Sequence, residues 1–525
     1  MVPATDLPRI TYADPGSGIE AAHRAFDAGL PAFRAERLGR SHANWIAGRP
    51  DEEGVPYTVA SPLDGDLGLG SFVAAGDPAV GRAVAAARAA FAVWGRMGWR
   101  DRVAAMRRVA DVLDGQRLTL AMASLYEVGK NRIEALGEAE EAVALVRYYC
   151  DQMEKNAGYV EPSSSGAAGE SSTTLLRPVG VFAVIAPFNY PVALTLNMVG
   201  AALVAGNTVV LKPTPGAGLT ASLLAAAFAE ADLPPGTLNI VCGETAGPAL
   251  VAAPGVDGFA FTGSYEVGTR ILRHAAAGPH MRPVLAEMGG KNAAYVSRSA
   301  DPRVAAEGIA RSAFNFQGQK CTACSVAFVH EDLFDGVLDI LVERAGAVRI
   351  GNTEERAVTN GPLINAASLD RYLRAVEQAG ARGRIVTGGN RLGGGLYDRG
   401  CYVEPTIVAG LPEDDELFRR ELFAPVLAVT PFRDLEEAIA RGNRTPYGLA
   451  AGFYGRDRAD MDRFLDTVEA GVLYVNRRYG ATTGAWPGVQ SFCGWKGSGL
   501  TGKGGLGPHY LPQFLREQSR TIRED

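Results

Sequence analysis

The stretch VFAVIAPFNYPVALTLNMVGAALVAGNTVVLKP, residues 181–213, decides the fold class. Its apolar runs predict a strand over 181–187, a helix over 192–205 and a second strand over 208–212. The alternation continues, with elements expected at 217–230 (helix), 238–242 (strand), 247–252 (helix), 258–262 (strand) and 267–276 (helix). Strands that alternate with helices are typical of a parallel sheet with right-handed crossovers. We therefore predict an α/β fold.

The strand-to-helix turns are the places where chemistry is expected. Ligands of parallel sheets bind at the carboxyl ends of the strands. In this chain those turns are 187–189, 212–215 and 261–264.

The rest of the chain divides by pattern. An N-terminal extension, 1–40, has helical apolar spacing from 19 to 38, and 42–75 reads as short strands and turns. Residues 77–149 have a helical pattern, and the Ser/Gly-rich segment 162–172 predicts a loop or an exposed ribbon. A second α/β region runs from about 288 to 475, with strands expected at 294–296, 325–329, 426–431 and 472–475.

Composition excludes several classes of protein. The 525 residues carry a net charge of −6, without the basic excess that nucleic-acid binding needs. Six cysteines are too few for a secreted disulfide framework, and the first 20 residues lack the apolar core of a signal peptide. The longest apolar stretch, 179–211, is broken by prolines and asparagines, which argues against a membrane span. We expect a cytoplasmic protein with no nucleic-acid or membrane partner.

One short segment carries a candidate nucleophile. Residues 315–324, NFQGQKCTAC, contain a CxxC pair, Cys321 and Cys324. A zinc half-site is one interpretation, but no second ligand pair is present, and we expect no metal. Cysteine is a strong nucleophile once its pKa falls or a base assists. None of the six histidines lies in a motif, so a carboxylate would have to serve, and Glu287 beside a double glycine is a candidate. The double glycine predicts an open, water-reachable backbone around this residue, and the alternative on spacing alone is an ordinary turn glutamate.

A single GxGxxG pattern occurs at Gly497, Gly499 and Gly502. A dinucleotide fingerprint would lie between a strand and a helix in a βαβ unit, and this pattern does not. We predict a flexible C-terminal loop instead.

Seven segments together identify a family. They are PFNYP (187–191), GNTVVLKP (206–213), FTGSYEVG (261–268), EMGGK (287–291), GQKC (318–321), ELFAPV (421–426) and SFCGWKGSG (491–499). In this order they resemble the aldehyde dehydrogenase superfamily over nearly the full length. Within it, FQGQKCTACS and TGAWPGVQSF (483–492) are most similar to the 1-pyrroline-5-carboxylate dehydrogenases, which oxidise L-glutamate γ-semialdehyde to glutamate.

The resemblance implies two doubly wound α/β domains plus a small β oligomerisation flap. It implies a cofactor-binding domain at 1–151 and 177–286, and a catalytic domain at 287–476. The flap would be 152–176 with 508–525, and 477–507 would be a substrate-anchoring loop. The expected assembly is a homodimer or a higher homo-oligomer.

The resemblance also assigns catalytic roles. Cys321 would attack the aldehyde, forming a thiohemiacetal and then a thioester. Glu287 would activate the water that hydrolyses the thioester. The side chain of Asn189 and the backbone N–H of Cys321 would form the oxyanion hole. Preorganised donors of this kind stabilise the negative charge that develops on the substrate oxygen.

The implied cofactor is NAD or NADP. The positions that match cofactor-binding residues are Pro187, Lys212, Gly263, Ser264, Gly268, Glu421 and Phe423. Many family members carry an acidic residue where this chain has Pro215, and that residue repels a 2′-phosphate. The preference between NAD and NADP therefore stays open.

The implied substrate site departs from the family pattern. Its positions are Thr322, Gly484, Ala485, Tyr190 and Phe492. Thr322 stands where a serine is usual and Tyr190 where phenylalanine is usual. Compared with the family, the segment 479–482 carries a three-residue insertion before the loop at Gly484 and Ala485. A different aldehyde, semialdehyde-acid or aromatic, therefore remains an alternative. A catalytically silent homologue would lack the cysteine or the glutamate, and a CoA-acylating enzyme would lack the glutamate.

Overall fold

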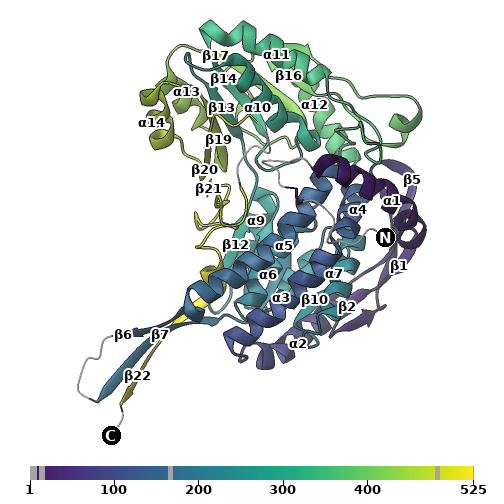
Figure 1. The fold of residues 1–525 in the computed structure, drawn as a ribbon, viewed down its shortest axis with the longest axis vertical. Coiled ribbons are helices and arrows are strands. Elements are labelled where there is room, and N and C mark those ends of the chain that lie inside the picture. Colours follow the sequence, from purple (N-terminus) through teal and green to yellow (C-terminus); the bar gives the residue numbers. More distant parts are fainter. Residues whose placement is uncertain (1–8, 11–17, 164–168, 479–484, 524–525) are drawn as a thin grey trace.

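The computed structural model describes residues 9–10, 18–163, 169–478 and 485–523. In this part of the chain, two seven-stranded sheets form two bodies, and a thin ribbon of strands leaves the lower body in Figure 1. The first sheet and its helices form the lower, blue and teal body, and the second sheet forms the green body above it (Figure 1). The two predicted α/β domains are therefore present.

The first sheet contains the stretch that decides the fold. Its strands in spatial order are β12 (Val284–Glu287), β11 (Gly258–Thr262), β8 (Val181–Ile185), β9 (Thr208–Lys212), β10 (Leu238–Ile240), β2 (Asn44–Ile46) and β3 (Arg49–Asp51). The strands from β12 to β10 are parallel, whereas β2 and β3 add an antiparallel edge. The crossover helices are α6 (Ala193–Val204), α7 (Gly218–Glu230), α8 (Ala246–Ala252) and α9 (Tyr265–Ala276).

Both faces of the first sheet are covered, which explains its continuous apolar strands. Along β8, Phe182 and Val184 pack into one core, and Val181 and Ala183 pack into another. The helices that pack into the first core are α6 and α7 together with α1 (Ile19–Arg37), α3 (Trp99–Gly115), α4 (Arg117–Val128) and α5 (Arg132–Lys155). The second core is closed by α2 (Asp77–Trp94), α8 and α9. A small sheet of β1 (Arg40–His42), β5 (Asp64–Ala74) and β4 (Val55–Ser61) lies at the periphery.

The second sheet repeats this design. Its spatial order is β15 (Arg384–Thr387), β16 (Thr406–Ala409), β17 (Val426–Phe432), β14 (Cys324–His330), β13 (Asn292–Val296), β19 (Ala450–Tyr454) and β20 (Val472–Val475). Only the β15–β16 pair of these described strands is antiparallel. The helices are α10 (Pro302–Phe314), α11 (Phe334–Gly346), α12 (Ala366–Arg382), α13 (Leu435–Gly442) and α14 (Arg458–Thr467). The short 3₁₀ helices are η3 (Ala157–Tyr159), η4 (Pro215–Ala217), η5 (Asn315–Gly318), η6 (Glu331–Leu333), η7 (Gly395–Arg399), η8 (Glu416–Phe418) and η9 (Leu511–Phe514).

The four strands expected in the second region fall within β13, β14, β17 and β20. Three strands of the second sheet were not expected, namely β15, β16 and β19, and neither was β12 of the first sheet. Each has only four or five residues, and β19 reads AAGFY, where alanine and glycine have low strand propensity. Their pairing partners, rather than their own composition, make them strands.

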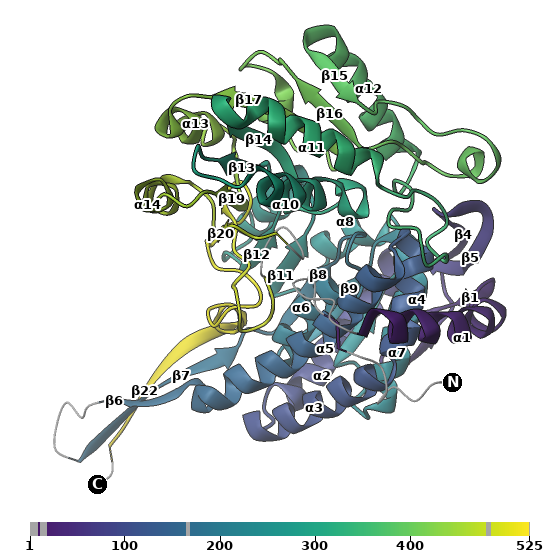
Figure 2. The same ribbon diagram turned by 45° about the horizontal axis from the view of Figure 1, so that its top comes forward.

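A three-stranded antiparallel ribbon extends away from the body (Figures 1 and 2). It consists of β6 (Val160–Ser163), β7 (Glu170–Pro178) and β22 (Leu515–Arg523), with β7 in the middle. The ribbon thus begins later than 152, because α5 continues to Lys155, and β7 runs past 176. Residues 511–514 are not part of it: Phe514 is fully buried and packs on Phe182.

A two-stranded pair, β18 (Tyr447–Gly448) and β21 (Trp495–Lys496), joins the C-terminal segment to the second body. Within the described ranges, no helix is both long enough and apolar enough to cross a lipid bilayer.

Candidate active site

A cavity of about 500 Å³ opens at the point where the first sheet changes direction. From β8 the chain moves to β9 on one side, and later returns to place β11 on the other side. Such a switch point is where open α/β sheets bind ligands. The turn after β8, residues 186–189, and the turn after β11, residues 261–264, both line the cavity. Of the third predicted turn, only Thr214 does.

Cys321 lines the same cavity and comes from the second body. It follows η5, where Phe316, Gln317 and Gly318 have positive φ angles of 52°, 53° and 64°. A side chain at Gly318 would lie 2.6 Å from the carbonyl oxygen of Ala424. Non-glycine residues persist in this strained conformation only where the surroundings enforce it, which is common at functional sites.

The backbone around Cys321 is held by Asn292, a residue that the sequence analysis missed. The amide of Asn292 donates to the carbonyl oxygens of Cys321 (2.8 Å) and Ala323 (2.9 Å). Its oxygen accepts from the backbone N–H of Ala450 at 3.0 Å. An asparagine within the buried run of β13 was the available signal, since buried polar groups are nearly always hydrogen-bonded.

Asn189 approaches Cys321 from the first body. Its side chain is 3% exposed, and its amide donates to the carbonyl oxygen of Gln319 at 3.0 Å. Cys321 and Asn189, expected to cooperate, are therefore on the wall of one cavity.

Among the residues that the structure describes, no cation shifts the thiol of Cys321 toward a thiolate. Burial raises the pKa of Cys321 well above its ordinary value, and the carboxyls of Glu287 and Glu421 raise it further. The backbone N–H groups of Cys321 and Thr322 act in the opposite direction. In the free protein, the group is therefore a thiol at neutral pH.

Glu287 ends β12 and does not line the cavity itself, whereas the next residue, Met288, does. Burial raises the pKa of its carboxyl to about 8, and Glu141 adds to the shift. Within the described part of the chain, no group hydrogen-bonds its buried Oε1 atom. The small cavity that Glu287 lines is shared with Phe261, Thr501 and Tyr510. A carboxyl of this kind is a proton acceptor tuned to near-neutral pH.

The expectation of an open backbone beside Glu287 is wrong. The carbonyl of Glu287 accepts from Gly263 at 3.1 Å, and the N–H of Met288 donates to the carbonyl of Ser498 at 2.9 Å. The hydroxyl of Ser498, which is fully buried, donates to Gly289 and accepts from Gly448. The glycine-rich loop 497–502 was expected to be flexible, but these bonds and the bridge of Gly499 to Glu287 fix it beneath the site.

Five of the seven residues predicted to bind the cofactor line the cavity: Pro187, Gly263, Ser264, Glu421 and Phe423. Ser264 caps α9, accepting from the N–H of Val267 at 3.4 Å, so the helix begins at the cavity. Helix N-termini favour anions, because their first N–H groups are free.

The other two residues lie outside the cavity. A side chain at Gly268 would lie 2.5 Å from the sulfur of Met288, so its glycine serves helix packing. Lys212 ends β9, where burial lowers its pKa and the neighbouring Cys242 and Glu244 oppose that shift.

Glu421 is placed by two glycines. Its carboxylate accepts from the N–H of Gly290 at 3.0 Å, and a side chain at Gly289 would overlap it at 2.0 Å. Burial raises the pKa of Glu421 to about 7. Nearby, Phe423 has a positive φ of 58° and meets Phe188 edge-on at 5.7 Å. The EMGGK glycines thus make room for the carboxylate.

The predicted substrate residues are only partly described. Tyr190, Ala485 and Phe492 are half-buried and pack against the same core of the first body. Thr322 is 7% exposed, and no described group hydrogen-bonds its hydroxyl. Gly484 and the segment 479–482 lie outside the described residues.

Buried ion pairs beneath the turn were not expected. Glu138 on α5 pairs with Lys130 at 2.6 Å, with both side chains fully buried. The other oxygen of Glu138 accepts from the N–H groups of Val192 and Ala193. The ammonium of Lys130 lies 3.4 Å from the ring centre of Tyr190. Glu134, one turn earlier on α5, pairs with Lys320 at 2.6 Å. The i, i+4 spacing of Glu134 and Glu138, which places both carboxylates on one helix face, could have indicated these pairs.

Comparisons with known proteins extend over nearly the whole chain. The sequence pattern named "Aldehyde dehydrogenase family" matches residues 49–519. A 1-pyrroline-5-carboxylate dehydrogenase of Geobacillus thermodenitrificans is 34% identical over 512 residues, covering 96% of this chain and 97% of that protein. The structure of a 1-pyrroline-5-carboxylate dehydrogenase from Thermus with bound NAD is 31% identical, with a TM-score of 0.91 over 98% of each chain. The structure of a 3,6-anhydro-L-galactose dehydrogenase is 30% identical, with a TM-score of 0.86 over 92% of this chain and all of that one.

Proposed function

Because the chain belongs to the aldehyde dehydrogenase family, we propose that it oxidises L-glutamate γ-semialdehyde to L-glutamate, with NAD or NADP as cofactor. The observation that supports this most is the shared cavity wall. Cys321 from one body and Asn189 from the other face the same space.

The residues present fit a nicotinamide dinucleotide. The start of α9 offers free N–H groups to a pyrophosphate, and the carboxylate of Glu421 offers acceptors to ribose hydroxyls. The space for that carboxylate exists only because residue 289 is glycine. When bound, the nicotinamide supplies the hydride acceptor that brings the aldehyde carbon to the oxidation level of an acid.

The first role of the chain is to form a covalent bond to the substrate. The thiol of Cys321 gives its proton to water, its sulfur then adds to the aldehyde carbon, and the carbonyl oxygen becomes an anion. The amide of Asn189 uses one N–H for Gln319 and has a second for that oxygen. Donors placed in advance for such an anion are worth about 3–4 kcal/mol each in the transition state.

The second role is to release the acyl group as an acid. We assign Glu287 as the base that takes a proton from water, while the water oxygen bonds to the thioester carbon and the Cys321 sulfur leaves. The buried Oε1 atom of Glu287 has no partner among the described residues, so it is available to a water molecule. A CoA-acylating enzyme would not need this carboxylate, and a silent homologue would not keep it with Cys321.

The environment of Thr322 supports a substrate that is held by its amino-acid end. Its hydroxyl is nearly buried, adjacent to the nucleophile, and not hydrogen-bonded by any described group. Such a group discriminates strongly, because a substrate without the matching partner leaves it unpaired. We infer that Thr322, with Ala485 and Gly484, holds the amino-acid end of the substrate, and that Tyr190 and Phe492 flank its chain.

The test is to compare kcat/KM for glutamate γ-semialdehyde with that for pentanal, which has no amino-acid group. We expect a preference of at least about a hundredfold, roughly 2.7 kcal/mol. Thr322→Val removes the hydroxyl at nearly constant volume and should reduce this preference mainly through KM. Equal rates with pentanal or benzaldehyde would overturn the substrate assignment but leave the aldehyde dehydrogenase chemistry standing. The resemblance to a sugar-aldehyde dehydrogenase makes a broader aldehyde panel the natural next step.

The residue at position 215 bears on the choice between NAD and NADP. Pro215 begins η4, and its carbonyl accepts from the hydroxyl of Tyr57 at 3.3 Å. A proline here neither binds a ribose hydroxyl through a carboxylate nor repels a 2′-phosphate. We therefore expect weaker discrimination between NAD and NADP than an acidic residue gives, measured as the ratio of their KM values.

We also propose a homo-oligomer in the cytoplasm. Most of β22 is exposed, and three-stranded ribbons without a packed face are seldom stable alone. Pairing or docking on a second copy would cover the edges of β6 and β22. All six cysteines are free thiols, which suits a reducing compartment.

A further inference from the structure

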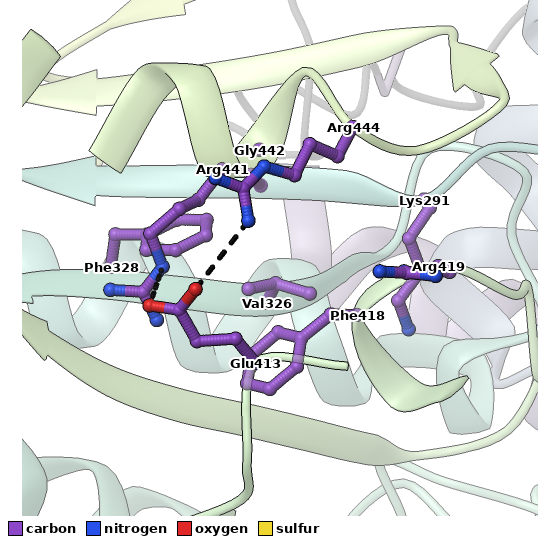
Figure 3. Close-up of a pocket in the computed structure, with 10 residues that line it drawn as sticks. Lys291, Val326, Phe328, Glu413, Phe418, Arg419, Arg441, Gly442 and Arg444 are labelled. Atoms are coloured by element: carbon purple, nitrogen blue, oxygen red, sulfur yellow. Dashed lines mark hydrogen bonds and ion pairs between the residues drawn. The ribbon is translucent and has the colours of Figure 1, made fainter. Parts of the chain in front are cut away.

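A separate pocket lies in the second body (Figure 3), and it shares no lining residue with the cavity around Cys321. Its floor is apolar, formed by Ala293, Val326, Phe328 and Phe418. Its free volume is about 20 Å³. A cavity of 10–15 Å³ holds one water, so this one has room for a water or one compact ion.

The pocket has an excess of positive charge. Four cationic side chains line it, against a single carboxylate. They are Lys291, Arg419, Arg441 and Arg444, and the carboxylate belongs to Glu413.

The carboxylate is already neutralised. Glu413 pairs with Arg441 at 3.2 Å and with Arg444 at 3.4 Å, toward one end of the pocket (Figure 3). Lys291 and Arg419 lie together at the other end (Figure 3). Within the described residues, neither of these two side chains forms an ion pair or a hydrogen bond.

Lys291 is the unusual member, because it is only 6% exposed. An unpaired ammonium in that position has lost its water without gaining a counter-charge, which is costly. The burial lowers the pKa of Lys291 to about 8, although Glu421 and Asp415 oppose the shift from a distance. Glu421 cannot serve as a direct partner here, since it accepts from Gly290 and faces the catalytic cavity.

We propose that this pocket binds one compact monovalent anion, either chloride or a single carboxylate group such as formate, between Lys291 and Arg419. The ammonium and the guanidinium donate to the anion, while the apolar floor limits its size. The site is independent of the substrate assignment. Phosphate is too large for the free volume, and a water molecule would leave the excess charge uncompensated.

A heavy-atom experiment locates the ion directly. Crystals of the full chain soaked in bromide should show an anomalous peak between the side chains of Lys291 and Arg419. Bromide peaks confined to the outer surface, with water in this pocket, would overturn the proposal.

Binding in solution is measured by thermal unfolding at constant ionic strength, with chloride or formate replacing gluconate, which is too bulky to enter. A ligand that binds only the folded state raises the midpoint with concentration, and we expect a rise of about 2 °C or more at concentrations well above Kd. Chloride and formate are compared separately, to distinguish an inorganic ion from a carboxylate.

Three variants separate the site from general salt effects. Lys291→Met should lose the response, yet remain as stable as the wild type in gluconate, because it removes an uncompensated charge. Arg419→Gln, at an exposed position, should weaken the apparent affinity for the anion by at least about fivefold. This variant tests the site even if Lys291→Met does not fold. Arg433→Gln, an exposed arginine that pairs with Glu331 instead, should respond as the wild type does. Equal responses in all four proteins would overturn the proposal.

Discussion

The side-chain amide of Asn189 donates to the carbonyl oxygen of Gln319 at 3.0 Å, and so links the turn after β8 to the loop that carries Cys321. The two residues belong to different bodies. This bond fixes the amide in place before any substrate arrives, which is the condition for stabilising an oxyanion without reorganisation.

Replacing Asn189 with alanine should lower kcat by about 10²–10³-fold, because one oxyanion donor is lost. Asn189→Asp should be at least as severe, since a carboxylate would face both the carbonyl of Gln319 and the developing negative charge. Steady-state kinetics with saturating cofactor measure the effect. A loss of less than tenfold for both variants would mean that another group supplies the donor.

Cys321→Ala should abolish turnover while cofactor binding, followed by fluorescence quenching, stays intact. The matched control is Cys324→Ala, three residues later. Cys324 is 2% exposed and its thiol contacts the carbonyl of Val326, so its loss should affect stability slightly and turnover little. Residual activity of more than a few per cent in Cys321→Ala would contradict the assignment.

Glu287→Gln should separate the two halves of the reaction. Acylation needs no water, whereas release of the acid does. Rapid mixing should therefore show a burst of reduced cofactor about equal to the concentration of active sites, followed by slow turnover. An unchanged steady-state rate would show that another group activates the water.

The same variant should change how stability depends on pH. The pKa of Glu287 is raised from 4.5 to about 8, so the folded protein holds this proton more tightly than the unfolded chain does. The stability that this provides is fully present below about pH 4.5 and is lost as the pH rises toward 8. Urea unfolding should thus show Glu287→Gln gaining stability relative to the wild type between pH 5 and pH 8. A pH-independent difference would mean that the pKa is not raised.

Removing the ribbon strand should give monomers if the ribbon mediates assembly. The cut should fall after Leu515, because Phe514 is buried and its carbonyl accepts from Asn207 at 2.9 Å. A cut after Leu511 would remove this core residue and should lower stability as well. Light scattering that shows an unchanged oligomer after the cut at Leu515 would place the interface elsewhere.

The sequence was most informative where a segment's own residues decide its structure. The apolar runs of β8 and β9 bury both faces, and their bounds were predicted within two residues. Cys321, Asn189 and Glu287 were identified by motif, and the structure places the first two on one cavity wall.

What could not be predicted depends on contacts between distant segments. Ser498 fixes the loop beneath Glu287 through Gly289, which lies 209 residues earlier in the chain, whereas glycine content alone predicted flexibility. Asn292 acts on the backbone of Cys321, and its partners are invisible in its own segment. The strand β19, rich in alanine and glycine, exists because β13 and β20 flank it.

Glu287 is the last residue of β12 in the first sheet, whereas Cys321 lies just before β14 of the second sheet. The proposed base and the proposed nucleophile therefore lie on different sheets, and the distance between them depends on how the two bodies pack against each other. We expect mild denaturant that weakens the packing between the two bodies to abolish turnover while both sheets remain folded. Turnover would then measure how well the two bodies are aligned. The circular dichroism signal of the secondary structure would change only at higher denaturant concentrations.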